Sequence, residues 1–296
     1  MFKQILLTLD GSKLAELALP YAITMVEAFG SEMDLVLVCD TPKREHHHEH
    51  QFYLEKMAKQ VAAKIGAKHP VTSIKPIVLE GYVATQIVDY SNKNDVSLIV
   101  MTTHGHSGIG AWALGSVTHK ILHAMDTPVL LVRAGFHIPD VGRGDLFKHI
   151  LVPLDGSETG EEALTYVTEL SRKLASAVIL CKVVEPGSHV HTIGGLDYVY
   201  FNKDEMDKFR ERSAEYLAGV AARMKDTKVT VRSETRIGNP AEEIIKLADE
   251  IGTCLIAMST HGRSGIKQWA LGSVTDKVIY AGKTPVLVVR AKHTHN

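Results

Sequence analysis

The chain contains two copies of one long sequence pattern, and this duplication constrains its fold more than any other feature. The stretch "KQILLTLDGSKLAELAL" begins at Lys3, and its counterpart "KHILVPLDGSETGEEAL" begins at Lys148. Further along, "MTTHGHSGIGAWALGSV" begins at Met101 and "MSTHGRSGIKQWALGSV" begins at Met258. A period of about 150 residues has the size of a domain and is too long for a solenoid repeat. We therefore predict two copies of one domain in tandem.

The domain boundaries follow from where the repeated pattern stops. We place the first domain at residues 1–135, a linker at residues 136–145 and the second domain at residues 146–296. The linker contains Gly and Pro, which interrupt regular structure. A chain of 296 residues also has the length expected of about two domains.

One insertion distinguishes the two copies. The offset between them is 145 residues at Asp10 and Asp155, and 157 residues at Gly105 and Gly262. The second copy therefore carries about twelve extra residues, which we place near Pro186–Phe201.

Each copy alternates short apolar runs with stretches of helical periodicity. In the first copy we expect strands at residues 4–9, 34–39, 73–79, 96–103 and 128–133. We expect helices near residues 14–25, 52–65, 83–92 and 112–124, the first of them kinked by Pro20. Five strands that alternate with helices predict an α/β fold with a doubly wound parallel sheet in each domain.

Composition and charge narrow the function classes. The formal net charge is −1 and the pI is about 7.0, so bulk charge gives no support for nucleic-acid binding. No apolar run reaches the 18 residues of a membrane helix, and an acid after nine residues argues against a signal peptide. The cysteines Cys39, Cys181 and Cys254 lie in or beside apolar stretches without metal-like spacing. We expect a cytoplasmic protein with buried, reduced thiols.

The glycine-rich segment follows the fourth expected strand and leads into a helix. Ligands of open α/β sheets bind beyond the carboxyl ends of the strands. Gly105 and Gly115 allow close approach of the backbone, and the helix start near Ser116 offers free N–H groups to an anion such as phosphate. The alternative is that these glycines only turn a loop. Two copies of the segment make that alternative weaker.

The segment resembles the nucleotide-binding motif of the universal stress protein family. That motif ends with a glycine, nine residues, a second glycine and a serine or threonine. Here Gly105 precedes Gly115 and Ser116 by this spacing, and Gly262 precedes Gly272 likewise. The resemblance extends over both copies. One position departs from it, because the motif's first glycine is replaced by the residues Thr102 and Ser259. Threonine is a poor fit there if the backbone needs a positive φ, and a hydroxyl there could instead donate to a phosphate.

The resemblance implies strand order 3-2-1-4-5, an adenine-nucleotide α-hydrolase-like fold and, in one subgroup, bound ATP. It implies that an aspartate lies near the adenosine and that a valine backbone meets adenine. It also implies phosphate and ribose contacts from the glycine-rich segment. The matching positions of the first copy are Asp10, Val38, Thr102, Gly105, Gly115, Ser116 and Val117. Those of the second are Asp155, Val183, Ser259, Gly262, Arg263, Gly272, Ser273 and Val274. We expect ATP, ADP or AMP as the ligand, with Mg²⁺ as a candidate companion.

Charge differences between the copies predict unequal sites. Arg263 and Lys267 of the second copy stand where the first has His106 and Gly110. A charge-assisted bond to phosphate contributes about 1.5–3 kcal/mol when it forms. We therefore predict that the second copy binds ATP more tightly and that its advantage shrinks as salt rises.

Two histidine-rich tracts raise the question of a metal. The first holds His46, His47, His48 and His50, and the second holds His189 and His191. Both are expected in the connection after the second strand. Histidine-rich tracts can bind metal, although a solvated polar loop is the simpler interpretation and the one we favour.

The fifth strands raise the question of pairing. They are apolar, and an uncovered edge strand exposes unpaired N–H and C=O groups. We expect the fifth strands of the two copies to pair as an intrachain pseudo-dimer, and a homodimer of whole chains stays open.

Three functions remain as hypotheses. The first is a cytoplasmic stress-response protein that binds an adenine nucleotide in each repeat in a regulatory role. The second is a slow ATP-hydrolysing or adenylate-transferring enzyme, and the third a nucleotide-free dimerising scaffold. No nucleophile, base and acid stand at a recognisable spacing, so no catalytic residue is identified.

Overall fold

The computed structural model describes residues 1–40, 44–65, 74–103, 114–133, 145–192, 195–224, 229–252, 254–260 and 271–290. Of residues 44–46, 189–192 and 195–197 it describes the backbone only. The predicted site residues Gly105, Gly262 and Arg263 lie outside the described residues, as do Lys267 and almost all of the linker. Residues 1–133 are called the first half below, and residues 145–290 the second half.

The first half alternates strands and helices as the apolar pattern predicts. Its elements are β1 (Gln4–Thr8), the 3₁₀ helix η1 (Ala15–Ala18), α1 (Leu19–Phe29), β2 (Glu32–Cys39), α2 (Arg44–Lys64), β3 (Ile74–Glu80), α3 (Val83–Lys93), β4 (Leu98–Thr102), α4 (Ser116–Ala124) and β5 (Val129–Val132). Strand β4 is buried along its whole length, which explains why it reads as a continuous apolar run.

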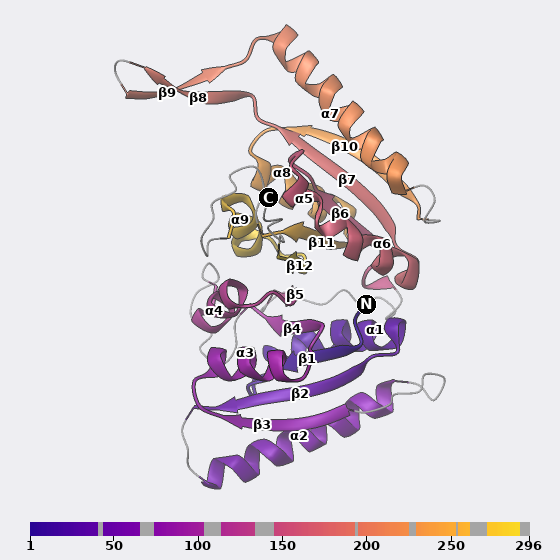
Figure 1. Ribbon diagram of the computed structural model, residues 1–296, viewed down its shortest axis with the longest axis vertical. Helices are drawn as coiled ribbons and strands as arrows, with labels where there is room; N and C mark the ends of the chain where they lie inside the picture. The colour runs from indigo at the N-terminus through magenta and orange to yellow at the C-terminus, as the bar shows by residue number, and fades with distance from the viewer. Residues whose placement is uncertain are drawn as a thin grey trace.

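The second half repeats this order with one addition. Its elements are β6 (His149–Pro153), α5 (Glu158–Glu161), α6 (Ala163–Leu174), β7 (Ala177–Val184), β8 (Gly187–Thr192), β9 (Gly195–Tyr200), α7 (Lys203–Met224), β10 (Val231–Ile237), α8 (Pro240–Ile251), β11 (Cys254–Ser259), α9 (Ser273–Ala281) and β12 (Val286–Val289). The addition is the antiparallel hairpin of β8 and β9, which stands away from the main sheet in Figure 1. It occupies the place predicted for the insertion.

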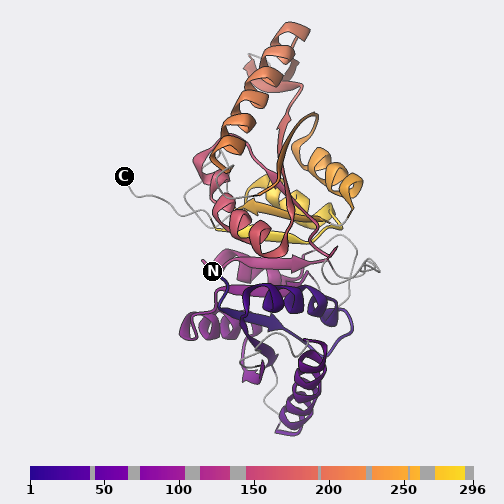
Figure 2. The same ribbon diagram turned by 90° about the vertical axis from the view of Figure 1, so that its right-hand side faces the viewer.

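All the other strands join in one ten-stranded sheet. Its order is β10-β7-β6-β11-β12-β5-β4-β1-β2-β3. Read inward from each outer edge to the centre, this is the predicted order 3-2-1-4-5 in each half. Within each half neighbouring strands run parallel, whereas β5 and β12 pair antiparallel. Helices cover both faces of the sheet, which runs the length of the molecule in Figure 2. The doubly wound α/β fold is confirmed.

The pairing of β5 with β12 confirms that the fifth strands join the halves. Leu130 lies opposite Leu287, and these two residues are equivalent in the repeat. The halves are therefore related by a pseudo-twofold axis that passes between them. Each fifth strand covers the edge of the other, so neither leaves its backbone groups unpaired at the centre.

Side chains continue this symmetric interface on one face of the sheet. The ring of Phe2 stacks on Tyr166 with centroids 6.0 Å apart, and Tyr21 contacts Phe147 at 5.6 Å. These are equivalent pairs, because Phe147 and Tyr166 are the second-half counterparts of Phe2 and Tyr21. Phe2, Tyr21 and Phe147 belong to one apolar core that extends through both halves. Burial of such large aromatic surfaces stabilises the union of the halves.

One expectation about the helices was wrong, and one was met in a different form. The helix expected at residues 14–25 is divided beside Pro20 into η1 and α1, and Pro20 lies in the first turn of α1, where a proline leaves no helical hydrogen bond unmade. Helix α2 begins at Arg44 instead of Phe52, so the first histidine tract is helical rather than part of a loop. Among the described residues, no helix has the length and apolar character needed to span a bilayer.

Candidate functional site

A cavity of about 260 Å³ opens in the second half, at the carboxyl ends of β6, β7 and β11. This volume is slightly below the range of about 300–1,000 Å³ that is typical of small-molecule sites. Six of the predicted second-half site residues line it together: Asp155, Val183, Ser259, Gly272, Ser273 and Val274. They come from four separate segments of the chain, and their role in binding stays a prediction.

The start of α9 forms one wall of this cavity. Gly272 is the N-cap residue, and its N–H donates to the carbonyl of Thr260 at 2.7 Å. The hydroxyl of Thr275 donates to the carbonyl of Ser259 at 3.0 Å, which fixes the first turn of α9 against the end of β11. The first N–H groups of a helix have no partner within the helix, so this wall is suited to an anion.

Ser259 presents a hydroxyl without a partner at the same wall. Its side-chain oxygen is buried and makes no hydrogen bond with any described residue, and the residue is only 6% exposed. A buried hydroxyl without a partner costs about 1–3 kcal/mol relative to a satisfied one. Because Ser259 lines the cavity, a polar ligand there would supply the missing partner.

Asp155 forms the opposite wall of the cavity. Its Oδ1 accepts hydrogen bonds from the backbone N–H of Ser157 at 3.0 Å and from the hydroxyl of that serine at 2.6 Å. A Cβ atom at Gly160 would lie 2.7 Å from this oxygen, so glycine leaves the room that the carboxylate occupies. Asp155 therefore caps the turn before α5, as an aspartate after a strand often does, and also borders the cavity.

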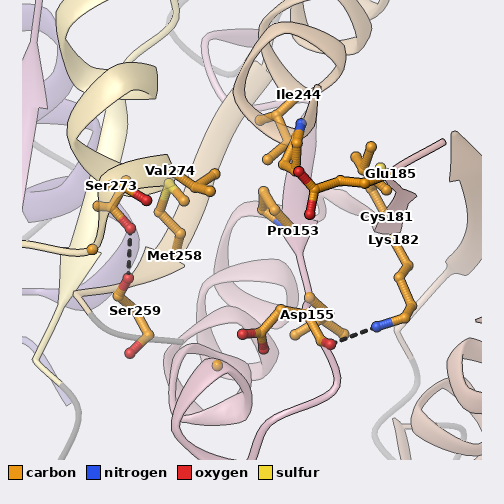
Figure 3. A pocket seen from close by; sticks show the side chains of 16 residues that line it. Pro153, Asp155, Cys181, Lys182, Glu185, Ile244, Met258, Ser259, Ser273 and Val274 are labelled. Atoms are coloured by element: carbon orange, nitrogen blue, oxygen red, sulfur yellow. Dashed lines mark hydrogen bonds between the residues drawn. The ribbon is translucent and has the colours of Figure 1, made fainter. Parts of the chain in front are cut away.

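Lys182 brings a positive charge to the cavity. Its Nζ donates to the backbone carbonyl of Asp155 at 2.5 Å and lies 5.2 Å from the centre of the Tyr216 ring. The hydroxyl of Tyr216 in turn donates to Glu161 at 2.8 Å. Figure 3 shows Lys182 reaching toward Asp155, with Ser259 and Ser273 on the other side of the space.

Cys181 contributes an apolar surface rather than a reactive thiol. It is fully buried beneath the cavity, and burial raises the pKa of its thiol to about 12. A thiol with such a pKa stays neutral near pH 7, and a neutral thiol is a poor nucleophile. The prediction that the cysteines are buried, free thiols is confirmed for all three.

The first half places the described members of its predicted set, which are all except Gly105, at the equivalent positions. Gly115 is the N-cap residue of α4, and its N–H donates to the carbonyl of Thr103 at 3.0 Å. The Oδ1 of Asp10 accepts from the N–H of Ser12 at 2.9 Å. The remaining residues follow the same pattern: Val38 lies in β2, Thr102 ends β4, and Ser116 and Val117 begin α4.

The residues that replace the motif's first glycine fit their positions without strain. Thr102 is the last residue of β4 and Ser259 is the last residue of β11, so both have extended backbone. Among the described residues, the non-glycine positions with positive φ are Asp95 and Ala175. A β-branched residue is favourable in a strand, so threonine is no obstacle here.

Several cavity residues were missed by reasoning from the sequence. The most informative is Lys182, a single charge within the apolar run of β7. Its first-half counterpart is Leu37, and this replacement was a signal that the duplicated sequence already held. Glu185, Pro240, Ile244 and Met258 also line the cavity. They were missed because nothing local shows that α8 packs against β7, or that β11 lies on the other side of β6 from β7 in the sheet.

The histidine tracts lie on different elements. His46, His47, His48 and His50 belong to α2, and the backbone of His189 and His191 belongs to β8. In Figure 1, α2 lies at the bottom of the molecule and the β8–β9 hairpin at the top. Among the described residues, no group of three side chains is arranged to hold a metal ion. A shared metal site for the two tracts therefore has no support.

Comparison with known proteins shows which family this chain resembles. A family model described as "Universal stress protein family" matches residues 1–133 and again residues 146–290. A universal stress protein of Methanocaldococcus jannaschii is 32% identical over 159 residues, which cover 50% of this chain and 98% of that protein. A universal stress protein of Mycolicibacterium smegmatis is 29% identical over 264 residues, which cover 89% of this chain and 82% of that protein.

A solved structure shares the fold over both halves. The crystal structure of a universal stress protein from Archaeoglobus fulgidus DSM 4304 matches with a TM-score of 0.65 and 22% sequence identity. The match covers 99% of this chain and 100% of that one, so the tandem arrangement of the fold is shared from end to end.

Proposed function

This chain belongs to the universal stress protein family, and we propose that it binds ATP or another adenine nucleotide, most tightly in the cavity of its second half. The observation that carries the proposal is Ser259, whose buried hydroxyl borders the cavity without a partner among the described residues. A ligand that makes a hydrogen bond with this buried hydroxyl would stabilise the folded protein.

The lining of the cavity suits the parts of a nucleotide. The apolar side chains of Val183, Ile244 and Met258 would pack against the base. The carboxylate of Asp155 would accept from ribose hydroxyls. The start of α9, with Ser273 and Ser259, would receive the phosphates, accompanied by Mg²⁺ where the phosphates bind it.

The first half would bind the same ligand more weakly. It keeps the helix start at Gly115 and the aspartate at position 10, but Leu37 stands in place of Lys182. The loss of a cation near the site lowers the attraction for phosphate, in the direction predicted from the charges of Arg263 and Lys267.

A regulatory role would use the connection between α9 and the first half. Helix α9 starts at the proposed phosphate site, and near its end the guanidinium of Arg133 donates to the carbonyls of Ile279, at 2.9 Å, and Tyr280. Arg133 is 8% exposed and belongs to the first half. A ligand that shifts or stiffens α9 would therefore alter a contact that joins the two halves, which gives nucleotide binding a structural output.

Calorimetric titration of ATP into the full chain tests the proposal. We expect two binding events of unequal affinity. Substitution of the cavity residues of the second half should weaken the tighter event and leave the weaker one unchanged. Mass spectrometry of material released from the purified protein should detect an adenine nucleotide if one is carried along. An absence of binding for ATP, ADP and AMP would contradict the proposal and favour the nucleotide-free scaffold. A parallel turnover assay separates binding from slow hydrolysis.

A further inference from the structure

Two histidines face each other on the surface of α4. His119 and His123 are one helical turn apart, so their side chains share one face of the helix. Their Nε2 atoms lie 3.1 Å apart, and their ring centroids are 4.2 Å apart at an angle of 44°. His119 is exposed and His123 is half-buried, so solvent can reach the pair. Neither histidine belongs to the proposed nucleotide site or to the histidine-rich tracts.

The separation of the two nitrogens matches two ligands of one metal ion. Imidazole nitrogens bind Zn²⁺ at about 2.0–2.1 Å, which places two tetrahedral ligands roughly 3.4 Å apart. The observed 3.1 Å is within a few tenths of that separation. Histidines four residues apart on a helix are also a recurrent pair of zinc ligands. The same distance permits a direct imidazole–imidazole hydrogen bond, and the experiment below separates these two arrangements.

A carboxylate from the other half lies near this pair. Asp276 of α9 is half-buried, and burial raises its pKa while the nearby imidazoles of His119 and His123 act in the opposite direction. The pseudo-twofold axis explains the proximity. Asp276 occupies in the second half the position that His119 occupies in the first. In Figure 1, α4 and α9 lie on the same side of the molecule, across the β5–β12 junction.

We propose that His119 and His123 form a binding site for a divalent transition metal ion, such as Zn²⁺ or Ni²⁺, with Asp276 as the carboxylate that compensates its charge. The described residues hold no complete set of three protein ligands, so water fills the remaining positions. Imidazole suits zinc, nickel and copper ions and disfavours Mg²⁺ and Ca²⁺. The pair is absent from the second half, where Asp276 and Tyr280 stand at the equivalent positions. The site therefore takes one ion per chain.

The location gives the ion a structural consequence. It would bind to α4 of the first half beside α9 of the second half, close to where Arg133 contacts the carbonyls at the end of α9. An ion that attracts Asp276 would strengthen the union of the halves. Because a ligand that binds only the folded state stabilises it, metal should raise the unfolding midpoint.

Zinc titration of the full chain tests the proposal in a background without the histidine tracts. In that background the residues His46, His47, His48, His50, His189 and His191 are all replaced by glutamine. We expect His119→Gln to weaken zinc binding at one site at least about tenfold, and His123→Gln to do the same. The double variant should lose little more than either single variant, because two ligands of one ion act as a unit. Asp276→Asn should weaken binding by roughly tenfold or less.

Lys120→Gln is the matched control, because Lys120 is exposed on the same helix. It should leave zinc affinity unchanged, and circular dichroism should show the same helix content in all variants. Zinc should raise the unfolding midpoint of the background protein and not that of the His119→Gln/His123→Gln variant. Equal zinc affinity and an equal rise in midpoint for both proteins would overturn the proposal and leave the imidazole pair as a hydrogen bond only.

Discussion

The two halves have the same backbone fold and differ in the side chains at equivalent positions. At the helix start, Gly115 and Gly272 make equivalent hydrogen bonds of 3.0 and 2.7 Å. In the second strand of each half, Leu37 of β2 corresponds to Lys182 of β7, whose ammonium group donates to the backbone carbonyl of Asp155. The comparison teaches that duplication kept the parts that fix the chain's path, while side chains at the cavity and in the core diverged.

In the core, the first half has a charged residue where the second half has an apolar one. Asp34 is 2% exposed, and its Oδ2 accepts from the side chain of Gln4 at 2.6 Å and from the hydroxyl of Tyr90 at 3.0 Å. The second-half counterpart is Ile179, which is fully buried in the apolar core. The first half therefore tolerates a buried carboxylate at a position where the second half has isoleucine. At its cavity the second half instead holds a cation, Lys182, and the hydroxyl of Ser259, which has no partner among the described residues.

The largest expected effect comes from the helix starts. Gly272→Val should lower the tighter ATP affinity by at least about a hundredfold, or about 2.7 kcal/mol. The cause is space rather than backbone conformation, because φ is −59° at Gly272 and −58° at Gly115. A Cβ at Gly115 would lie 3.1 Å from the carbonyl of Thr103, and the branches of valine would point to where an anion binds. Calorimetry measures the change.

Gly115→Val is the matched variant for that experiment. It should leave the tighter event intact and remove the weaker one. If both substitutions reduce the same event equally, or if neither changes ATP affinity, the assignment of unequal sites to the two halves is wrong. Thermal unfolding should confirm that both variants stay folded.

Ser259→Ala should have two effects of opposite sign. Loss of the hydroxyl should weaken ATP binding about tenfold, the size of one charge-assisted hydrogen bond. The same change should stabilise the ligand-free protein by about 1 kcal/mol, because it removes a buried polar group without a partner. Urea unfolding and calorimetry measure the two effects. Thr102→Ala in the first half is the comparison, and a loss of ligand-free stability in Ser259→Ala would contradict the interpretation of its hydroxyl.

An exchange of charge between the halves should move their affinities toward each other. Lys182→Leu copies the first-half residue and should weaken the tighter event roughly three- to tenfold, with a smaller effect at high salt because salt screens the charge. Leu37→Lys makes the reciprocal change. Both titrations should use the full chain, since separated halves would expose β5 and β12 as apolar edge strands. A Lys182→Leu variant whose ATP affinity shows the same salt dependence as the unchanged protein would exclude an electrostatic role.

The smallest effect concerns pH and the core. Burial raises the pKa of Asp34 in the folded chain, with the Tyr90 and Gln4 hydrogen bonds opposing the shift. A folded-state pKa above the unfolded one means that stability is highest below the pKa of an exposed aspartate and falls as pH rises through the raised value. Asp34→Asn removes this loss, so its stability relative to the unchanged protein should rise by about 1 kcal/mol between acid and neutral pH. Urea unfolding across that range measures it, and parallel pH curves for the two proteins would rule the effect out.

Local patterns account for what could be predicted. The apolar run at β4 and the helical periodicity at α3 depend on neighbours in sequence, and both elements appear within about two residues of their expected positions. The insertion was placed correctly because the offset between the copies changes there. The predicted start of helix α2 is too late, because its first turns are rich in histidine and charged residues and carry no apolar stripe that would indicate a helix.

The candidate site divides along the same line. Gly272 and Asp155, which line the cavity, could be predicted because both copies carry a glycine and an aspartate at these positions. Lys182 and Pro240 were not predicted, because their place at the cavity depends on the packing of α8 against β7. Gly105, Gly262 and Arg263 lie outside the described residues, so their part in the site stays a prediction.

The sequence by itself determined the duplication, the alternation of strands and helices, and the family likeness. These properties depend on residues near one another in the chain, and the repeat makes the patterns easier to recognise. The tertiary structure alone decided that the hydroxyl of Ser259 has no partner among the described residues, that Lys182 reaches Asp155, and that the His119–His123 pair lies near a carboxylate of the other half. The last two of these features bring together segments that lie far apart in the sequence, and they arise only when burial of the apolar strands brings those segments together.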